Sequence, residues 1–262
     1  MPERRAFPLD YRALDYAYLE RANRTLLELF ARHVLTRTHA PRVLDVGAGA
    51  GANARALSAL APRAKLVAIE PNARAAELLR AGRAEVHHGS LESWLASAPT
   101  AAFDAVLLSD VIEHVEKPVE FLERLRQHPA TASALFLVSV PNYAVWYNRV
   151  RTLLGRFEYD WSGLYDRTHL RFFTRRSIAR LLEHVGLEIL EQGSTPSLVQ
   201  SAAPLLRRGF AKRLEDGEHL TLGDSAAFRA YSRFVEPLET RVCQLWPELL
   251  GFQIVTAARG GG

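Results

Sequence analysis

Between Pro41 and about Asn142 the chain alternates between short apolar runs and segments that carry apolar residues at helical spacing. The apolar runs are RVLDVGAG, KLVAIEP, FDAVLLSD and ALFLVSVPN, with AEVHHGS as a weaker fifth. Such runs are typical of parallel strands that are buried on both faces. Helices are indicated between them by ANARALSALA, NARAAELLRAG and PVEFLERLRQH, with a helical turn at LESWLAS. Strands that alternate with helices favour right-handed βαβ units, so we expect an α/β domain of three layers.

The flanking segments add helices and two more strands. One or two amphipathic helices are predicted by LDYRALDYAYLERANRTLLELFARHVL, before the first strand. After the predicted strand ALFLVSVPN, the fifth in chain order, TRRSIARLLEHVG predicts a helix with Thr174 as its N-cap and Gly186 as its C-cap. LEILEQGS and FQIVTAAR predict an antiparallel strand pair, separated by roughly fifty residues, too many for a hairpin. We expect an N-terminal helical segment at 1–38 and a main domain at 39–262 with a helical insert at 197–250.

The composition limits the class of protein. A chain of 262 residues fits one domain with an appendage or two small domains, and 48% hydrophobic residues rule out a largely disordered chain. The single cysteine, Cys243, excludes a disulfide framework and lies in an apolar context that indicates packing. The N-terminus does not resemble a secretory signal, and no run approaches the ~18 apolar residues of a membrane span. We therefore expect a cytoplasmic protein.

A glycine-rich turn is the strongest functional signal. Gly47, Gly49 and Gly51 follow the first predicted strand and precede a helix, so a ligand could lie against main-chain atoms there. Glu70 ends the second strand, where a carboxylate can accept both hydroxyl protons of a ribose. The G-x-G-x-G spacing, preceded by Asp45, differs from the G-x-G-x-x-G that is typical of dinucleotide binding. This pattern favours an adenosine-containing ligand that ends in an amino acid.

With these motifs, LDVGAGAG, VAIEPN and FDAVLLSDVIEHV, the chain resembles class I S-adenosylmethionine-dependent methyltransferases over about residues 40–195 and the final strand. The resemblance implies a Rossmann-like, three-layer α/β sandwich. Its seven-stranded sheet would have the order 3-2-1-4-5-7-6, with strand 7 antiparallel. The implied cofactor is S-adenosyl-L-methionine, with S-adenosyl-L-homocysteine as the product. The residues that would bind it are Asp45, Gly47, Ala48, Gly49, Gly51, Glu70, Pro71, Ser90, Leu91, Glu92, Ser109 and Asp110.

A second motif indicates a narrower branch. Residues 163–174, GLYDRTHLRFFT, resemble the pattern G-x-L-D-x-T-H-x-R-F-F-T of bacterial methyltransferases, with Tyr165 as the departure. Members of that branch often accompany glycan, lipid or natural-product assembly. The match covers a single loop and says little about the substrate.

Methyl transfer to a hydroxyl requires a base near the ends of strands four and five. His169 is our first candidate, with Asp166 to orient its imidazole and raise its basicity; a structural histidine that bonds the loop to the strand ends is the alternative. His114 is the second candidate, although a packing role beside the cofactor is favoured for it. We find no set of ligands at the short spacings typical of metal sites, so we expect no metal.

Residues 143–173 are rich in aromatic side chains and arginine, which favours a lid over the acceptor, with core packing as the alternative. The candidate substrate-binding residues are Tyr143, Trp146, Tyr147, Arg167 and Arg171. The net charge is +4, and the window 148–180 holds eight arginines against three acidic residues. Since guanidinium groups grip carboxylates and phosphates, this excess favours an anionic acceptor, with solvated helix-face arginines as the alternative.

The sequence therefore predicts a methyltransferase of a small-molecule or carrier-linked glycan acceptor, most simply an O-methyltransferase of a sugar or natural product. N-methylation of a small molecule or peptide natural product is an alternative. Another class would be a nucleic-acid methyltransferase, but we expect no nucleic-acid partner because no RNA-binding module accompanies the domain. A non-catalytic S-adenosylmethionine-binding protein is a further alternative. We expect a monomer or homodimer without stable membrane insertion, and weak association with a membrane surface stays open.

Overall fold

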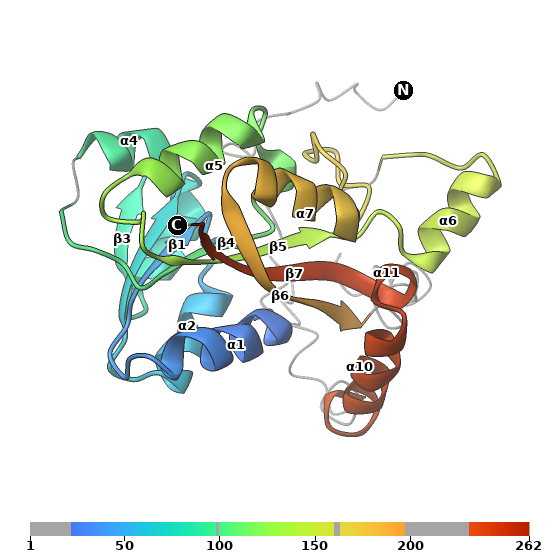
Figure 1. Cartoon of the computed structure of the whole chain (residues 1–262), viewed down its shortest axis with the longest axis horizontal. Coiled ribbons are helices and arrows are strands. Elements are labelled where there is room, and N and C mark those ends of the chain that lie inside the picture. The colour runs from blue at the N-terminus through green and yellow to red at the C-terminus, as the bar shows by residue number, and fades with distance from the viewer. Residues whose placement is uncertain (1–21, 98–99, 160–162, 197–230, 262) are drawn as a thin grey trace, which may run out of the picture.

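The computed structural model describes residues 22–97, 100–159, 163–196 and 231–261 (Figure 1). Residues 1–21 of the predicted N-terminal helical segment, residues 160–162 of the predicted lid and residues 197–230 of the predicted insert lie outside these ranges. The strands are β1 (Arg42–Val46), β2 (Lys65–Glu70), β3 (Glu85–His88), β4 (Ala105–Ser109), β5 (Leu135–Pro141), β6 (Leu187–Pro196) and β7 (Gly251–Gly260). The helices are α1 (Arg24–Phe30), η2 (Ala31–Leu35), α2 (Ala52–Leu60), α3 (Ala73–Arg80), α4 (Leu91–Ala96), η3 (Ile112–His114), α5 (Pro118–Gln127), α6 (Trp146–Leu153), α7 (Arg175–His184), η5 (Tyr231–Val235), α10 (Glu236–Leu245) and α11 (Pro247–Leu250).

The seven strands form one sheet in the order β3-β2-β1-β4-β5-β7-β6. Strands β1 to β5 run parallel to one another, and β7 runs antiparallel to both β5 and β6. This confirms the predicted order and the reversed seventh strand. Even the weak run AEVHHGS forms a strand, because β3 pairs with β2 over four residues. The carboxyl ends of β1 to β4 therefore meet at one edge of the sheet, where ligands bind in open α/β folds.

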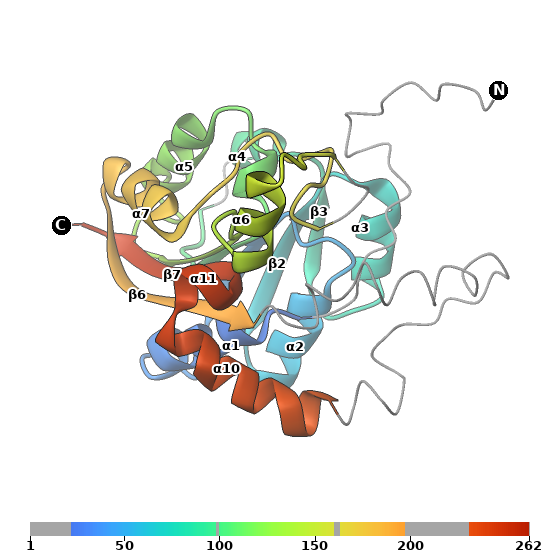
Figure 2. The same ribbon diagram turned by 90° about the vertical axis from the view of Figure 1, so that its right-hand side faces the viewer.

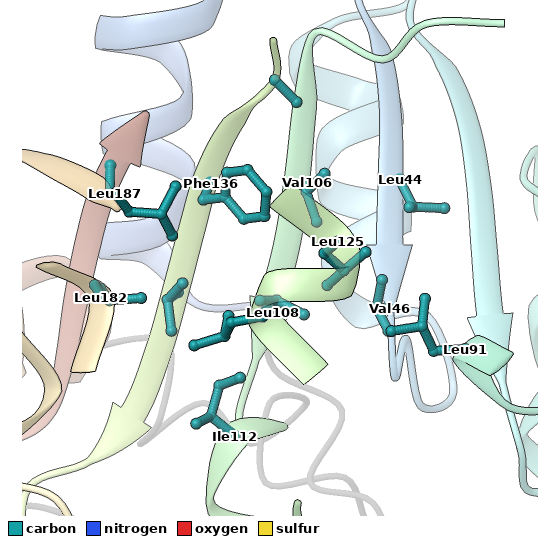
Figure 3. Close-up of a cluster of buried hydrophobic side chains, with 14 of the residues drawn as sticks. Leu44, Val46, Leu91, Val106, Leu108, Ile112, Leu125, Phe136, Leu182 and Leu187 are labelled. Carbon is teal, nitrogen blue, oxygen red and sulfur yellow. The ribbon is translucent and has the colours of Figure 1, made fainter. Parts of the chain in front are cut away.

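Helices cover both faces of the sheet, and the strand residues alternate between two cores. One core holds Leu44, Val106 and Phe136 against helices α4, α5 and α7 (Figure 3). The other core holds Val43, Ala105 and Leu135 against α1, α2 and α3. Figures 1 and 2 show these two helical layers on opposite sides of the strands. Burial on both faces explains why the strands read as continuous apolar runs.

Side-chain and glycine caps define the ends of α1 and α7. Thr174 caps α7 in a capping box with Ser177, and Gly186 follows the helix with a φ of +78°. Both residues were predicted as caps. Asn23 caps α1 by accepting a bond from the backbone N–H of Leu26, at 3.0 Å. Asn23 and Thr174 thus fix where α1 and α7 begin, and Gly186 fixes where α7 ends.

The part of the predicted insert that is described is helical, with η5, α10 and α11 leading into β7. Cys243 of α10 is 1% exposed, and its Sγ lies 3.7 Å from the carbonyl oxygen of Thr195, as expected for a packing residue. Among the described helices, none has the length and apolar content that are needed to cross a membrane.

Candidate active site

The glycine turn after β1 needs glycine for two physical reasons. Gly47, Gly49 and Gly51 have φ values of +69°, +56° and +88°, a region that side chains disfavour. A Cβ built on Gly47 would lie 2.7 Å from Cγ2 of Val111, and one on Gly51 would lie 2.7 Å from Cδ2 of Leu79. The backbone N–H of Gly47 donates to the carbonyl of Ile69 at 2.8 Å, which ties the turn to β2.

Glu70 lies fully buried beneath this turn. Its Oε2 accepts a hydrogen bond from the N–H of Gly49 at 2.7 Å, and its Oε1 accepts one from the N–H of Asn72 at 2.8 Å. Burial raises the pKa of Glu70, while these two bonds and the nearby His88 lower it. Besides its predicted ribose role, Glu70 thus holds the glycine turn in place, which the sequence analysis did not anticipate.

Asp45 places a second buried carboxyl group beside Glu70. Its side chain is 2% exposed, and neither oxygen has a hydrogen-bond partner in the part of the chain that the structure describes. Burial, and secondarily the negative charge of Glu70, raise the pKa of Asp45 to about 7. Burying such a group without a partner is costly, so the pair provides an electrostatic environment suited to a positively charged ligand.

The predicted adenine side lies next to Glu70. The N–H of Gly89 donates to the carbonyl of Glu70 at 3.1 Å, which brings the end of β3 to the end of β2. Ser90 caps α4 by accepting a bond from the N–H of Ser93 at 3.3 Å, and Leu91 is buried in the core. Of the other candidates here, Pro71 is half-buried and Glu92 is exposed. Because the side chain of Leu91 packs inward, a contact with adenine is predicted for its backbone alone.

At the end of β4, Asp110 adopts a φ of +55°, which is rare for a residue with a side chain. Its carboxylate accepts a hydrogen bond from Nε2 of Gln253 at 2.5 Å and a longer one from Oγ of Ser139 at 3.4 Å. Oγ of Ser139 also lies 3.1 Å from Oγ of Ser109. Burial raises the pKa of Asp110 to about 6, against the lowering effect of these bonds. Gln253 and Ser139 were not predicted.

The segment after Asp110 leads from the glycine turn to the candidate bases. Val111 lies against Gly47, and η3 then presents Glu113 and His114. The carbonyl of Glu113 accepts bonds from the N–H groups of Leu170 and Arg171, at 2.8 and 3.0 Å. The structure therefore brings the loop of the G-x-L-D-x-T-H-x-R-F-F-T motif onto the end of β4.

His114 and His169 lie together, with ring centroids 4.9 Å apart and an edge-to-face angle of 65°. Nδ1 of His114 lies 3.1 Å from the carbonyl of Thr168, and Nδ1 of His169 lies 3.1 Å from the carbonyl of Leu164. A carbonyl only accepts, so each Nδ1 donates a proton and each neutral ring carries its lone pair on Nε2.

Burial favours the neutral form of both imidazoles. Burial lowers the pKa of His114 to about 4, and it also lowers the pKa of His169. The negative charge of Asp166 acts in the opposite direction on both rings. The prediction that Asp166 raises the basicity of His169 agrees in sign, but burial outweighs it.

Asp166 was predicted to orient the imidazole of His169, but it is not the acceptor of the Nδ1 proton of that ring. Its Oδ1 instead accepts bonds from the N–H and Oγ1 of Thr168, at 2.9 and 2.7 Å, and the carbonyl of Leu164 takes the imidazole proton. These bonds to Thr168 stabilise the loop that carries His169.

Glu113 was missed by the sequence analysis. Its side chain is 1% exposed, and neither carboxylate oxygen has a hydrogen-bond partner within the described ranges. Burial raises its pKa well above the usual value, and the charges of Asp110 and Asp166 raise it further. Its carboxylate lies in one cluster with a ring nitrogen of His114 and one of His169, all within 4.8 Å of one another. No local spacing reveals this set, because His169 comes from a distant loop.

The aromatic stretch forms a small core of its own rather than a uniformly open surface. Val145, Leu164 and Tyr165 are buried there, with Tyr143 and Tyr147 packed against them. Tyr165 also lies beneath the guanidinium of Arg151, 4.4 Å from the ring centroid. Trp146 remains 37% exposed. Core packing thus holds for Val145, Leu164 and Tyr165, and a lid over the acceptor stays a prediction.

Arg167 and Arg171, the two arginines predicted to bind the substrate, are not part of this aromatic core. Arg171 is exposed, and its guanidinium donates to the carbonyls of Glu116, at 2.7 Å, and Leu170, at 3.0 Å. Arg167 is half-buried. A hollow of about 470 Å³ lies beside α6, α7 and α11, lined by Arg149, Arg175, Leu245, Trp246, Pro247, Glu248 and Leu249. Two arginines of the basic window thus reach one concave surface.

A family described as a methyltransferase domain matches residues 17–192 of the chain. Over 124 residues the chain is 31% identical to the mitochondrial ubiquinone biosynthesis O-methyltransferase of Schizosaccharomyces pombe, a match that spans 44% of this chain. It spans 40% of that relative, less than half of its length.

Solved structures share the fold at low identity. A SAM-dependent methyltransferase from Archaeoglobus fulgidus superposes with a TM-score of 0.53 at 17% identity, covering 90% of this chain and 94% of that one. The plantazolicin methyltransferase BpumL, in complex with a monoazolic desmethylPZN analog and SAH, gives 0.56 at 14% identity, covering 91% and 83%. These likenesses confirm the expected Rossmann-like sandwich.

Proposed function

The chain belongs to the methyltransferase-domain family, and from this premise we propose that it uses S-adenosyl-L-methionine to methylate a small-molecule or carrier-linked acceptor at a hydroxyl oxygen. The observation that carries the proposal is the buried carboxyl pair, Asp45 and Glu70, beneath the glycine turn.

The carboxyl groups and the glycine turn suit the cofactor. The unpartnered, buried Asp45 would be compensated by a cationic group, and a methionine ammonium is such a group. Each oxygen of Glu70 already accepts one backbone bond and can accept a second, so the carboxylate can take two ribose hydroxyls. The adenine would lie beside Ser90 and the backbone of Leu91, and the methionyl part along Gly47, Ser109 and Asp110.

When bound, S-adenosylmethionine supplies a methyl group that its sulfonium has already activated. The chain must therefore hold the acceptor oxygen in line and remove its proton. His169 meets the requirement for a base, because its ring is neutral and its Nε2 carries the lone pair. The negative charge of Asp166 would favour the imidazolium that forms after the proton is taken. His114 has the same tautomer and is the second candidate.

The acceptor is proposed to carry an anionic group. Arg149 and Arg175 line the hollow beside α11 together with Trp246, a combination that suits a carboxylate or phosphate attached to an apolar or sugar ring. Transfer to oxygen is supported by the O-methyltransferase activity in the name of the curated relative. N-methylation of a small molecule or peptide natural product remains the alternative within the same site.

Two other classes of protein would behave differently with S-adenosylmethionine. A nucleic-acid methyltransferase would act on RNA or DNA rather than on small hydroxylated compounds. A non-catalytic S-adenosylmethionine-binding protein would bind the cofactor without forming S-adenosylhomocysteine from it.

The experiment offers the purified chain S-adenosylmethionine and matched panels of hydroxylated compounds, amines and nucleic acids. S-adenosylhomocysteine formation is followed by mass spectrometry. We expect turnover with hydroxylated compounds, and faster turnover when they carry a carboxylate or phosphate. Turnover with amines or nucleic acid alone would contradict the oxygen assignment, and cofactor binding without turnover on any panel would favour the non-catalytic class.

His169→Gln then tests the base. We expect turnover to fall by ~100-fold while the affinity for S-adenosylmethionine stays near that of the wild type. His184→Gln, which changes an exposed histidine at the end of α7, is the matched control and should have no effect. An unchanged rate in His169→Gln would return His169 to a structural role.

A further inference from the structure

Three side chains that can ligate a metal ion converge beside the candidate site. Glu113 and His114 come from the single turn η3, and His169 comes from the loop before α7. One carboxylate oxygen and one nitrogen from each ring lie within 4.8 Å of one another. One ion at a coordination distance of about 2.0–2.2 Å could reach all three atoms with small side-chain adjustments.

The side chain of Glu113 is buried, at 1% exposed, and neither carboxylate oxygen has a hydrogen-bond partner within the described residues. A buried carboxylate without partners is rare, because its desolvation cost is not offset. Asp110 and Asp166 add negative charge around it. Two negative charges next to the Glu113 carboxyl group make this place favourable for a bound cation.

The two imidazoles are arranged as metal-bound histidines usually are. Each donates its Nδ1 proton to a backbone carbonyl, His114 to Thr168 and His169 to Leu164, both at 3.1 Å. These bonds fix the ring orientation and place the lone pair on Nε2. Backbone carbonyls are common outer partners of histidine ligands because they set this tautomer.

We propose that Glu113, His114 and His169 form a binding site for a divalent transition-metal cation. Two imidazoles and one carboxylate are a donor set that suits Zn²⁺, Fe²⁺ or Mn²⁺ better than Mg²⁺ or Ca²⁺, which prefer oxygen ligands. Three protein ligands leave a coordination position open, as in metal sites that act on a substrate.

The role of the cation rests on the proposed function, whereas its binding does not. An acceptor hydroxyl on the open position would lose its proton to solvent more readily, since a cation stabilises the oxygen anion. His169 would then act as a ligand rather than as a base. The two roles can be told apart, because turnover would require a metal ion if His169 is a ligand and would not require one if His169 is the base.

The test uses the full chain after treatment with a chelator. Zn²⁺ is titrated in by calorimetry, and Co²⁺ is titrated in parallel because its visible absorption reports coordination by protein ligands. We expect one strong site per chain. Glu113→Gln and His169→Gln should each weaken Zn²⁺ binding by at least ~10-fold and change the Co²⁺ spectrum.

The chain carries its own matched control. Glu183 and His184 form the same Glu-His pair on the exposed end of α7, so Glu183→Gln and His184→Gln should leave binding unchanged. Equal binding by wild type and Glu113→Gln would overturn the proposal, as would an equal loss in the control variants. A wild type without a strong site would also overturn it and would mean that Glu113 is held as a neutral acid.

Folding is checked by thermal denaturation without metal. Glu113→Gln keeps the shape and removes a buried acid, so it should fold even if His169→Gln does not. S-adenosylmethionine affinity is measured on the same samples. Loss of the metal site with cofactor binding intact would leave the proposed function standing, and the reverse result would contradict the proposed function alone.

Discussion

Replacing Gly47 by alanine tests the geometry of the glycine turn. Gly47 has a φ of +69°, and a left-handed conformation costs a residue with a side chain roughly 1–2 kcal/mol. The new methyl group would lie 2.7 Å from Cγ2 of Val111, which is far inside van der Waals contact. Overpacking of this kind adds about 1–3 kcal/mol. We expect Gly47→Ala to lower the free energy of unfolding by about 3 kcal/mol.

Gly155→Ala separates the two contributions. Gly155 also has a φ of +69°, but among the described residues no atom lies within 4 Å of the position that its Cβ would take. It should therefore lose only the conformational part, about 1 kcal/mol. The double variant Gly47→Ala/Val111→Ala should recover part of the difference, because it removes the methyl group that the new Cβ meets.

Urea unfolding followed by circular dichroism measures all three variants, and calorimetry measures their affinity for S-adenosylmethionine. We expect Gly47→Ala to bind at least ~10-fold more weakly, because a displaced turn moves main-chain groups by more than binding tolerates. Gly155→Ala should bind like the wild type. Equal losses of stability in Gly47→Ala and Gly155→Ala would refute the close approach of Val111 to the turn.

Three further predictions concern pH, capping and the aromatic core. Burial raises the pKa of Asp45 from 3.8 to about 7, so the native state holds a proton that the unfolded chain releases, and stability falls as the pH rises through this window. Asp45→Asn should remove this loss, which is about 4 kcal/mol by linkage. Urea unfolding is measured below and above the window, and an equal change in the free energy of unfolding of wild type and Asp45→Asn would contradict this effect of burial. Thr174→Ala removes the capping box of α7 and should cost ~1 kcal/mol in urea unfolding; a negligible loss would contradict a stabilising cap. Arg151→Met should cost about 0.5–1 kcal/mol more than Arg151→Lys, which keeps a cation over Tyr165, and equal thermal midpoints would contradict that contact.

The sheet could be predicted because each strand is identified by its own residues. KLVAIE and AVLLS are buried on both faces, so they are apolar at nearly every position. The cap residues Thr174 and Gly186 were predictable for the same reason, since capping depends on a few neighbouring residues. The antiparallel pair β6 and β7 was predicted from its own two apolar runs, whereas the place of β7 between β5 and β6 followed from the resemblance.

Contacts between distant segments could not be predicted. Gln253 reaches Asp110 from the far end of the chain, and His169 joins Glu113 from another loop. Neither pair has a fixed spacing that a motif could express. The buried state of Glu113 was also hidden, because an acid after a strand usually faces solvent.

Short-range roles were in part assigned to the wrong group. Asp166 lies near His169 in sequence, yet the backbone carbonyl of Leu164 takes the Nδ1 proton. Backbone acceptors are present at every residue, so the side-chain pattern gives no sign of them. Glu70 shows the converse, since its carboxylate accepts a bond from the N–H of Gly49, a role that the predicted contact with a ribose did not suggest.

The most direct test of the central claim is the calorimetric affinity for S-adenosylmethionine of the wild type, Glu70→Ala and Glu77→Ala. Glu70 is buried beneath the glycine turn, whereas Glu77 is an exposed acid on α3 and serves as the matched control. We predict that the wild type and Glu77→Ala bind alike and that binding by Glu70→Ala is lost. A wild type that does not bind S-adenosylmethionine, or a Glu70→Ala variant that binds as tightly as the wild type, would contradict the account.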